Sequence, residues 1–388
     1  MVEIPNPYSA EHPAPPEKFA GRKNQITEFK RFLKDTINGN SKNIAVLGEW
    51  GIGKTSMLRM FKYLAEEEGC IGTIIELGEA TDSFVTLFEI ITQSLAKDAR
   101  YKKKITTKTK EFLESLTLSV KYVPVGISYT KRKEIPPNIM KFREDLISIY
   151  KKVNAPYLIM LDNAEQLMNI KGSIFELRNI FQTLQSMAGV NCMLILAGRE
   201  TLFADIRSAS EPAARFFWRI DLEPFTHEET KEAIQKPLID TPIHFHKDCI
   251  KRIHQASNGH PYFVQVFTYN IFNFRKNMKI DVIDLDENYP MIFDYLGRRL
   301  FETLYENISL NEQRVIQGFA KADKDILTNE EVATVTKVKS VNRYLKSLSE
   351  IKPPVLIKLN RGKYKLFHPL FKEYLRREKG IEVRASEV

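Results

Sequence analysis

Short apolar runs alternate with amphipathic stretches over the first 225 residues of the chain. The runs predict buried strands at residues 44–47, 74–77, 157–161 and 193–196, with a weaker fifth strand at 219–222. Apolar residues at helical spacing lie between them and predict helices, including one at about residues 54–68. Because strands that alternate with helices are typical of a parallel sheet covered on both faces, we expect an α/β fold.

A basic stretch interrupts this alternation. Residues 100–110 carry six lysines and arginines, and residues 116–130 alternate apolar and polar positions like a hairpin. We interpret residues 99–135 as an insertion at the edge of the sheet, either a surface that contacts a partner or a decorated loop. A helix is predicted at residues 83–95, before this insertion, and Asp82 is placed to cap its N-terminus.

From Thr226 the pattern is helical. Thr226 and Glu229 have the spacing of a capping box, which marks the start of a helix. Further helices are predicted at residues 247–257 and 263–274, with a break between them at a Gly-His-Pro sequence. We expect this part to form a helical lid.

The last segment has the order of a winged helix-turn-helix. Ser309 and Thr328 each have a glutamate three residues later, and Ser340 is placed to cap a third helix. Residues 353–359 and 363–367 then predict a hairpin. Three helices followed by a hairpin predict a winged helix at the C-terminal end.

The composition is that of a globular protein. The 388 residues are 43% hydrophobic and 28% charged, and the longest apolar runs are far shorter than the ~20 residues that cross a bilayer. The N-terminus lacks the basic and apolar regions of a secretory signal. Three scattered cysteines without CxxC spacing argue against a disulfide framework or a zinc ribbon. We therefore expect a cytoplasmic protein with no membrane partner.

The net charge of +9 is concentrated in one segment. Residues 337–379 hold 13 lysines and arginines against 3 acidic residues, so the rest of the chain is about neutral. A basic block on a neutral body is the electrostatic footprint expected for a polyanion-binding surface. The alternative is a solvated basic face without a ligand.

Residues 48–55 match the phosphate-binding pattern GxxxxGK[ST], with a predicted strand before them and a helix after them. Glycines let the backbone curl so that its N–H groups face an anion, and the following helix adds its positive end. We expect Lys54 to reach the β- and γ-phosphates and the Thr55 hydroxyl to bind Mg²⁺. The residues predicted to bind the nucleotide here are Gly48, Glu49, Trp50, Gly51, Ile52, Gly53, Lys54, Thr55 and Ser56.

An acidic residue follows the apolar run at residues 157–161. Asp162 would stand at the carboxyl edge of the sheet and hold Mg²⁺ beside Thr55, unless it only caps a helix. Many such ATPases place a glutamate next, where this chain has Asn163. We therefore expect slow hydrolysis, and we expect Asn163→Glu to speed it. Glu165 is the leading candidate to replace that glutamate, and Glu49 is a weaker one.

Three arginines are candidates for sensing or assisting the reaction. Arg199 follows the fourth predicted strand and either reaches the γ-phosphate or pairs with Glu200 at the surface. Arg215 and Arg219 lie near the fifth strand, and one of them could act as an arginine finger on a neighbouring copy in a homo-oligomer. The alternative for both is packing over nearby aromatic rings.

These features together resemble the AAA+ ATPases of the origin-recognition-like and STAND groups. Phe-Ala-Gly-Arg at residues 19–22 is similar to their FxGR box, which implies that Gly21 and Arg22 lie against the adenine. Arg199 ends a strand similar to the STAND sensor-1 strand. The Gly-His-Pro sequence is similar to the STAND GxP motif, whose proline, Pro261 here, touches the base from the lid.

The resemblance covers about residues 5–375 and implies a sheet order of 5-1-4-3-2. The Asp162 strand resembles the family's Walker B strand, and the Glu-Trp-Gly of the phosphate-binding loop also resembles KAP-type proteins. The predicted parts are an extended proline-rich arm at 1–17, a P-loop ATPase domain at 18–225, a helical lid at 226–300 and a winged-helix domain at 301–388.

Our leading interpretation is a switch that binds ATP or ADP with Mg²⁺, hydrolyses ATP slowly, and couples nucleotide state to duplex DNA binding. One alternative is a STAND signalling or defence ATPase whose winged helix binds protein. Another is a nucleotide-binding scaffold that hardly turns over. Winged helices place their third helix in the major groove and their hairpin on the backbone. The candidate DNA contacts are Lys339, Asn342, Arg343, Lys346, Arg361 and Lys363.

Overall fold

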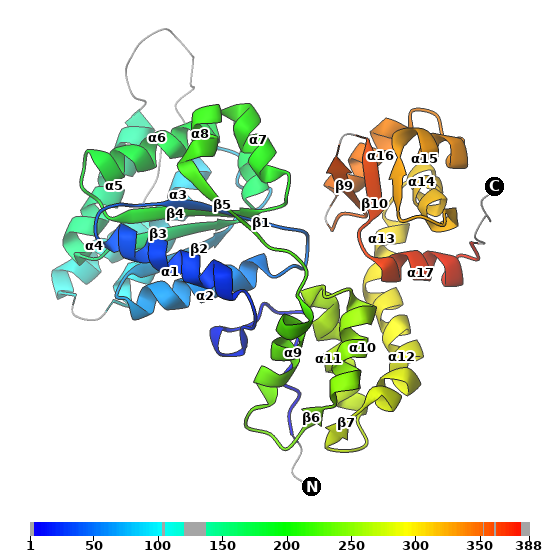
Figure 1. Ribbon diagram of the computed structural model, residues 1–388. Helices are drawn as coiled ribbons and strands as arrows, with labels where there is room; N and C mark the ends of the chain where they lie inside the picture. The colour runs from blue at the N-terminus through cyan, green and yellow to red at the C-terminus, as the bar shows by residue number, and fades with distance from the viewer. Residues whose placement is uncertain (1–3, 103–104, 120–136, 352, 361, 382–388) are drawn as a thin grey trace. The chain divides into compact units, whose positions relative to one another are not determined.

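The computed structural model describes residues 4–102, 105–119, 137–351, 353–360 and 362–381, which group into two compact units (Figure 1). The sheet unit comprises residues 12–223. The helical unit combines the residues up to 11 with the residues from 224 onward. The four-part division at residues 17, 225 and 300 stays a prediction.

The sheet unit is built around five parallel strands in the order β2-β3-β4-β1-β5. This order confirms the one implied by the family resemblance. Its elements are η1 (Pro16–Lys18), α1 (Lys23–Ile37), β1 (Asn43–Leu47), α2 (Lys54–Glu67), β2 (Ile71–Glu76), α3 (Phe84–Arg100), α4 (Thr107–Ser119), α5 (Pro137–Val153), β3 (Tyr157–Asp162), η2 (Ala164–Asn169), α6 (Ser173–Ser186), β4 (Cys192–Gly198), α7 (Leu202–Ala209), α8 (Glu211–Phe216) and β5 (Phe217–Asp221).

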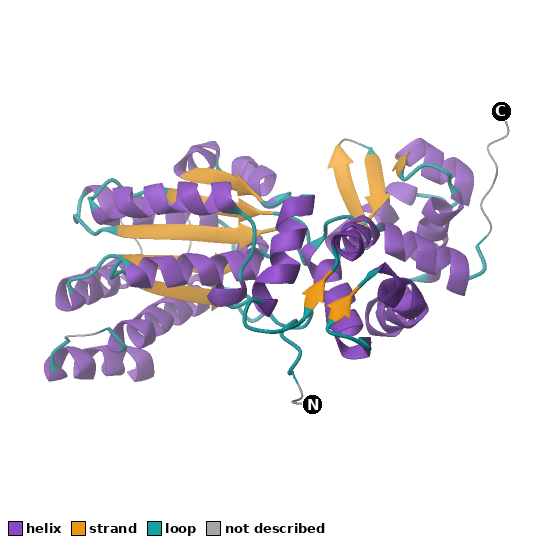
Figure 2. Ribbon diagram, turned by 60° about the horizontal axis from the view of Figure 1, so that its bottom comes forward, coloured by secondary structure: helices purple, strands orange, loops and turns teal. Residues whose placement is uncertain are grey.

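Helices cover both faces of the sheet, as the apolar strands require (Figure 2). On one face Val46 of β1 packs with Phe29 of α1 and Phe61 of α2, whose rings stack 3.8 Å apart. On the other face alternate strand residues pack against α3, α5 and α6, where Phe88 and Phe142 stack 4.2 Å apart. Alternation along each strand therefore supplies two separate cores.

Two local predictions in the sheet unit were wrong. Residues 116–119 belong to α4, so they are helical rather than part of a hairpin, and residues 120–136 lie outside the described residues. The helix α3 is capped by Ser83, whose hydroxyl accepts a hydrogen bond from the Thr86 N–H, and not by Asp82. Serine and aspartate are both good caps, and the sequence alone did not choose between neighbours.

The helical unit carries a winged helix in the predicted order. The helices α14, α15 and α16 are followed by the hairpin strands β9 and β10, and these form an antiparallel sheet of order β8-β10-β9 with β8, an unpredicted strand between α14 and α15. The elements of the unit are α9 (His227–Gln235), η3 (Lys236–Leu238), β6 (His244–Phe245), α10 (Lys247–Ser257), α11 (Pro261–Phe274), β7 (Lys279–Ile280), α12 (Val282–Leu296), the π-helical η4 (Gly297–Phe301), α13 (Glu302–Glu306), α14 (Leu310–Lys321), β8 (Ile326–Thr328), α15 (Asn329–Thr336), α16 (Val341–Glu350), β9 (Leu356–Asn360), β10 (Lys363–Leu366) and α17 (Pro369–Glu378).

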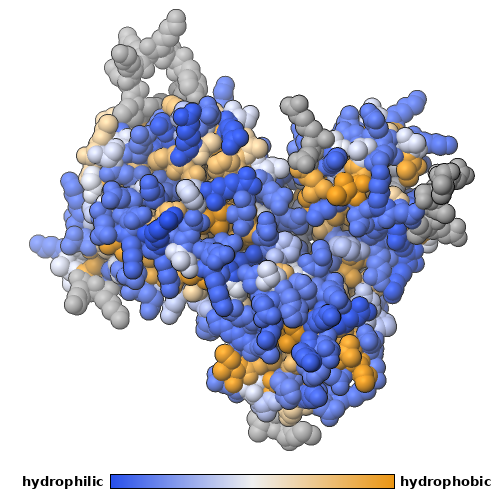
Figure 3. All heavy atoms as spheres, viewed as in Figure 1, coloured by the Kyte–Doolittle hydropathy of each residue, from blue (hydrophilic) through white to orange (hydrophobic). Residues whose placement is uncertain are grey.

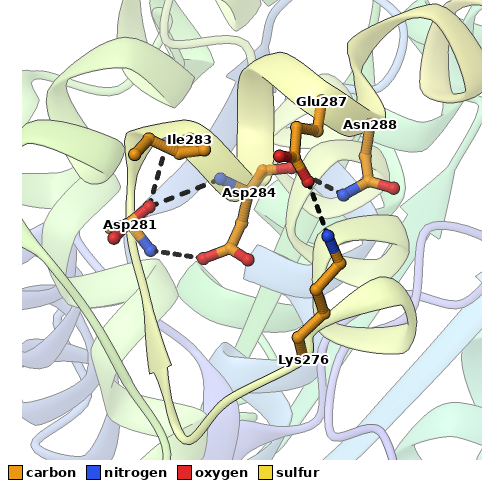
Figure 4. Close-up of polar contacts among 6 residues, drawn as sticks. All are labelled: Lys276, Asp281, Ile283, Asp284, Glu287 and Asn288. Atoms are coloured by element: carbon orange, nitrogen blue, oxygen red, sulfur yellow. Dashed lines mark hydrogen bonds and ion pairs between the residues drawn. The ribbon is translucent and has the colours of Figure 1, made fainter.

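Capping boxes start several helices of this unit. The predicted boxes at Thr226, Ser309 and Thr328 are confirmed. A further box at the start of α12 pairs Asp281 with Asp284, and each carboxylate accepts from the other residue's N–H (Figure 4). Aspartate in place of glutamate hid this box from the sequence pattern.

Ser340 lies at the predicted cap position of α16 but does not act as a side-chain cap. Its backbone is left-handed, with φ 57°, and its side chain makes no capping hydrogen bond. Lys337, which ends α15, is also left-handed at φ 55°. The turn between α15 and α16 is therefore set by two non-glycine residues in a sparsely populated backbone region.

The N-terminal segment is an integral part of the helical unit. Tyr8 is buried, its hydroxyl donates to the Ile234 carbonyl oxygen at 2.6 Å, and its ring meets Phe245 and Phe272 edge-on. Asn6 adds a hydrogen bond to the Tyr269 carbonyl oxygen. An unpartnered tyrosine hydroxyl would be costly to bury, so this bond accounts for the depth of the ring.

The next residues of the same segment belong to the sheet unit. The N–H of Ala14 donates to Ser56 Oγ at 3.0 Å, and Arg59 donates to the Pro13 carbonyl oxygen. The proline-rich segment is thus fixed by hydrogen bonds to residues far along the chain, first within one unit and then within the other.

A buried histidine joins the winged helix to the preceding helices. His368 caps α17 through Nδ1, which accepts from the Leu370 N–H, so Nε2 carries the proton and donates to the Ser257 carbonyl oxygen at 2.9 Å. The ring lies 3.8 Å from that of Phe263, and both side chains are buried. Burial lowers the pKa of His368 to about 3.

No helix among the described residues is long and apolar enough to cross a membrane. Hydrophilic residues cover most of the face drawn in Figure 3.

The low pKa of His368 makes the stability of the helical unit depend on pH. Because the pKa rises from about 3 in the folded state to the ordinary 6.5 on unfolding, the stabilisation is complete above pH 6.5. It is lost as the pH falls toward 3, by up to ~1.4 kcal/mol per pH unit. Hydrogen exchange of the α17 amides measures the free energy of opening. Between pH 6.5 and about 4.5 this free energy should fall less in His368→Gln than in the wild type. The exposed His244→Gln should follow the wild type; parallel curves for all three proteins would refute the assignment.

Candidate functional site

The phosphate-binding loop runs from the end of β1 to the start of α2. Gly51 and Gly53 have φ of 72° and 99°, a region in which side chains are strained. Gly48 is required for space instead, because a Cβ there would lie 2.9 Å from the Leu222 carbonyl oxygen and 2.7 Å from Ile52 Cγ2. Gly53 offers no side-chain cap to α2, so this helix end is suited to an anion.

Lys54 is the cation of the loop, and its side chain is partly buried. Its Nζ donates to the carbonyl oxygens of Gly48 at 2.9 Å and Glu49 at 2.8 Å. Burial lowers the pKa of Lys54, because a charged ammonium loses its hydration. Nearby carboxylates oppose this effect and belong to Asp162, Glu165, Glu200 and Glu49.

Asp162 meets the loop at the carboxyl end of β3. The Thr55 hydroxyl donates to Asp162 Oδ2 at 2.5 Å, and the Asn163 N–H donates to the other carboxylate oxygen at 3.0 Å. Asp162 is buried, and its backbone carbonyl accepts from the Leu77 N–H. A hydroxyl and a carboxylate at this spacing are hard oxygen donors of the kind that Mg²⁺ prefers.

The FxGR box contacts the loop through its arginine. Arg22 is buried, and its Nη2 donates to the Ile52 carbonyl oxygen at 3.2 Å. Its backbone is left-handed at φ 61°, as is that of Gly21 at φ 69°. Arg22 therefore supports the loop through its hydrogen bond to Ile52, and its contact with adenine stays a prediction.

The side chains of Asn163 and Glu165, which follow Asp162, have different neighbours. Asn163 is left-handed at φ 54°, and its Nδ2 donates to Glu76 Oε1 at 3.4 Å, at the end of the neighbouring strand β2. The 3₁₀ turn η2 then places Glu165 at the side of β4 and near enough to Lys54 to raise the lysine's pKa. Of these two residues, Glu165 and not Asn163 interacts electrostatically with Lys54.

The three candidate arginines have different surroundings. Arg199 directly follows β4, and its Nε is buried without a hydrogen bond. Arg215 is 76% exposed and pairs with Glu211 at 3.0 Å. Arg219 donates to both carboxylate oxygens of Asp221 at 2.8 Å. Both side chains are therefore paired with a carboxylate, and Arg215, near the end of α8, is more exposed than Arg219, which is 49% exposed.

The described candidate DNA contacts are all exposed, and two of them also pair with a neighbouring side chain. Arg361 lies outside the described residues. The side-chain oxygen Oδ1 of Asn342 accepts from Asn329 Nδ2 at 2.6 Å, and Lys346 Nζ lies 3.9 Å from Glu350 Oε1. The exposed candidates on α16, on the turn before it and on the wing are Lys339, Asn342, Arg343, Lys346 and Lys363.

Part of the basic block serves the fold. Lys372 is buried and donates to Asp325 at 2.8 Å, and Arg376 donates to the carbonyl oxygens of Ala320 and Ala322 near the end of α14. Charge counting therefore overestimates the surface left for a polyanion, because α17 turns these cations toward internal acceptors.

Pro261 begins α11 in the helical unit, and its role at the base stays a prediction. Sequence reasoning missed Glu76 and Gly198, which lie at the carboxyl ends of β2 and β4. Their places at the ends of predicted strands were the only signal available for them.

Comparisons with known proteins identify a family and a relative of the chain. A family model described as Novel STAND NTPase 1 matches residues 8–269. An uncharacterized HTH-type transcriptional regulator of Methanocaldococcus jannaschii is 26% identical over 261 residues, which cover 63% of this chain. The match spans 60% of that relative's length.

Two solved structures are similar over nearly the whole chain. A Walker-type ATPase of Pyrococcus abyssi has a TM-score of 0.61 at 15% identity, covering 95% of this chain and 100% of that one. The Aeropyrum pernix ORC2 protein, solved as ADPNP–ADP complexes, has a TM-score of 0.61 at 12% identity, covering 96% and 98%. At these identities the likeness shows the fold alone.

We expect that removing the hydrogen bond from Arg22 to the loop lowers the affinity for nucleotide. Arg22→Gln should raise the Kd for a fluorescent ATP analogue about tenfold, since a charge-assisted hydrogen bond contributes ~1.5–3 kcal/mol. Lys30→Gln, an equal charge change at an exposed position on α1, should leave the Kd unchanged. An unaltered Kd in folded Arg22→Gln would show that the loop does not need this hydrogen bond.

Proposed function

The chain belongs to the Novel STAND NTPase 1 family, and we propose that it is an ATP-hydrolysing switch that couples nucleotide state to DNA binding through its winged helix. The observation that carries the first half is the 2.5 Å contact between Thr55 and Asp162 beside the partly buried Lys54. A phosphate-binding loop and an acidic strand end meet there at the carboxyl edge of a parallel sheet, where ligands of such sheets bind.

The proposed reaction is attack of water on the γ-phosphorus of ATP. The new bond forms between the water oxygen and phosphorus, the bond to the β-phosphate oxygen breaks, and ADP leaves with that electron pair. Lys54 stabilises the charge on the β- and γ-phosphates. The loop N–H groups hold the phosphates in place, so the protein's main contribution is positioning and electrostatics.

Thr55 and Asp162 would hold Mg²⁺, which supplies a Lewis acid that neutralises phosphate charge when it is bound. The Asp162 carboxylate keeps one oxygen on the Thr55 hydroxyl and the other on the Asn163 N–H. These bonds fix the direction of both side chains before any ligand arrives.

Glu165 is proposed to orient the water and accept its proton. Its carboxylate lies beside β4 and near Lys54, whereas Asn163 points to Glu76. A glutamate at position 163 would meet the Glu76 carboxylate and would require a strained left-handed backbone. This geometry argues against the expectation that Asn163→Glu speeds hydrolysis.

Two arginines are proposed to respond to the γ-phosphate. Arg199 leaves β4 at the same sheet edge, and its buried Nε lacks a hydrogen bond that a phosphate oxygen could accept. Arg215 is the better candidate for an arginine finger acting on a second copy, since it is more exposed than Arg219 and makes one hydrogen bond to Glu211, whereas Arg219 donates to both carboxylate oxygens of Asp221. A homo-oligomer in which Arg215 completes a neighbouring site is part of the proposal.

Duplex DNA is the proposed partner of the winged helix. The support is the exposed Lys339, Arg343 and Lys363, together with the description of the Methanocaldococcus relative as an HTH-type transcriptional regulator. Lysines and arginines that contact phosphate give sequence-independent affinity, and Asn342 and Arg343 could read base edges. If the duplex does not bind, the result would favour a protein as the partner of the winged helix.

ATP turnover tests the nucleotide half of the proposal. Glu165→Gln should lower kcat at least about 100-fold, the usual contribution of a general base, with little change in the Kd for Mg–ATP. Lys54→Ala should lose binding or turnover altogether, because the phosphates lose their cation. The exposed Glu67→Gln on α2 should behave as the wild type. ATPase activity retained in Lys54→Ala would overturn the site.

A salt series with labelled duplex DNA tests the second half. Log affinity should fall linearly with log salt, and Arg343→Ala should lower the slope by about one. Arg298→Ala removes the same charge from η4, between α12 and α13 and outside the winged helix, and should leave the slope unchanged. Wild-type affinity should also differ with and without Mg–ATP. Absent or salt-independent binding would refute DNA as the partner.

A further inference from the structure

Gly198 ends β4 at the carboxyl edge of the sheet, next to the phosphate-binding loop. It pairs in register with Leu47, the last residue of β1, and its carbonyl oxygen accepts a hydrogen bond from the Gly48 N–H at 3.2 Å. It precedes Arg199 and is completely enclosed by its neighbours. The residue therefore touches the backbone on both sides of the point where the loop begins.

The need for glycine at this position is spatial and not conformational. The backbone of Gly198 lies outside the left-handed region, so an alanine could adopt its φ without strain. A Cβ on it, however, would lie 2.9 Å from Glu165 Oε2 and 2.6 Å from Leu202 Cδ2. Both distances are shorter than real Cβ contacts, so something would have to move.

The groups around this space differ in their freedom to move. Gly198 itself is held by the strand pairing and by the Gly48 hydrogen bond. Leu202 is fully buried at the start of α7, whose first turn is closed by a bond from its own N–H to the Arg199 carbonyl oxygen. Glu165 is partly buried as a residue and its Oε2 is enclosed, but this oxygen lies at the end of a flexible side chain. A methyl group would therefore displace chiefly the Glu165 carboxylate.

We propose that Gly198 is a positioning residue: its missing side chain provides the space in which the Glu165 carboxylate is held toward Lys54. This inference rests on the water-orienting role proposed for Glu165. It adds that the direction of that carboxylate is set by Gly198 at the end of β4, outside the η2 turn that carries Glu165. The carboxylate is fixed from the side of β4, and η2 supplies only its starting point.

A displaced carboxylate should impair the chemical step and spare nucleotide binding, because the loop and its donors are unchanged. Gly198→Ala should therefore lower kcat at least about tenfold while the Kd for Mg–ATP changes less than about threefold. In the Glu165→Gln background the same substitution should cause no further loss of kcat, because the group that it displaces is already inactive.

Gly78 provides a matched control. It follows β2, its φ lies outside the left-handed region, and a Cβ on it would meet nothing within 4 Å. Gly78→Ala should keep the wild-type kcat and Kd. A wild-type kcat in Gly198→Ala would overturn the inference, as would a further loss of kcat when Gly198→Ala is added to Glu165→Gln.

A second measurement tests the contact without using activity. Both tryptophans, Trp50 and Trp218, lie in the sheet unit, so their fluorescence during urea unfolding of the full chain reports that unit alone. The loss in urea midpoint caused by Gly198→Ala should shrink by about half or more when Glu165 is replaced by Ala. The contact of the added Cβ with Leu202 is present in both Gly198→Ala proteins, with and without Glu165, and therefore cancels from the cycle.

The outcomes separate the two claims. Additive midpoint changes would overturn the role of Gly198 even if Glu165→Gln abolishes turnover. A wild-type kcat in Glu165→Gln would instead overturn the proposed role of Glu165. A non-additive midpoint cycle combined with a kcat loss in Gly198→Ala supports both.

Discussion

The burial of one ammonium group governs the arrangement of the site. Lys54 loses hydration that a free lysine would keep, and an uncompensated buried charge costs several kcal/mol. Two carbonyl oxygens of its own loop accept hydrogen bonds from it, and carboxylates from three other segments lie around it. The loop glycines and the ends of β3 and β4 are all arranged to make this cation tolerable without neutralising it, so its charge remains usable by an anion.

The parallel sheet satisfies this constraint through its register. Because β1, β3 and β4 run in the same direction, Leu47, Asp162 and Gly198 end at the same edge, although over 100 residues separate the first from the others. Each strand end then supplies something different. The end of β1 starts the loop, the end of β3 supplies a carboxylate, and the end of β4 supplies empty space and a carbonyl acceptor. Small changes in backbone position at this edge would alter all three.

The sequence predicted the parts of the structure that depend on local pattern. The strands at this edge, the phosphate-binding loop and three capping boxes follow from periodicity or from short spacings, and the helices of the winged domain follow similarly. What it missed depends on partners distant in the chain. The direction of Asn163 depends on Glu76, and α17 turns Lys372 inward because Asp325 is there. Hairpin-like alternation at residues 116–119 gave way to α4, whose side chains pack on α3 and α5.

The burial of Tyr8 has a consequence for the order in which the chain acquires its structure. The sheet unit is one continuous segment, whereas the core of the helical unit needs a residue that lies 226 positions before the carbonyl it binds. Such a long sequence separation makes loop closure slow and late. During synthesis the sheet unit can therefore fold first, while Tyr8 waits in an unpacked segment. Completion of the helical unit then pulls the start of the chain into place as one of its last steps.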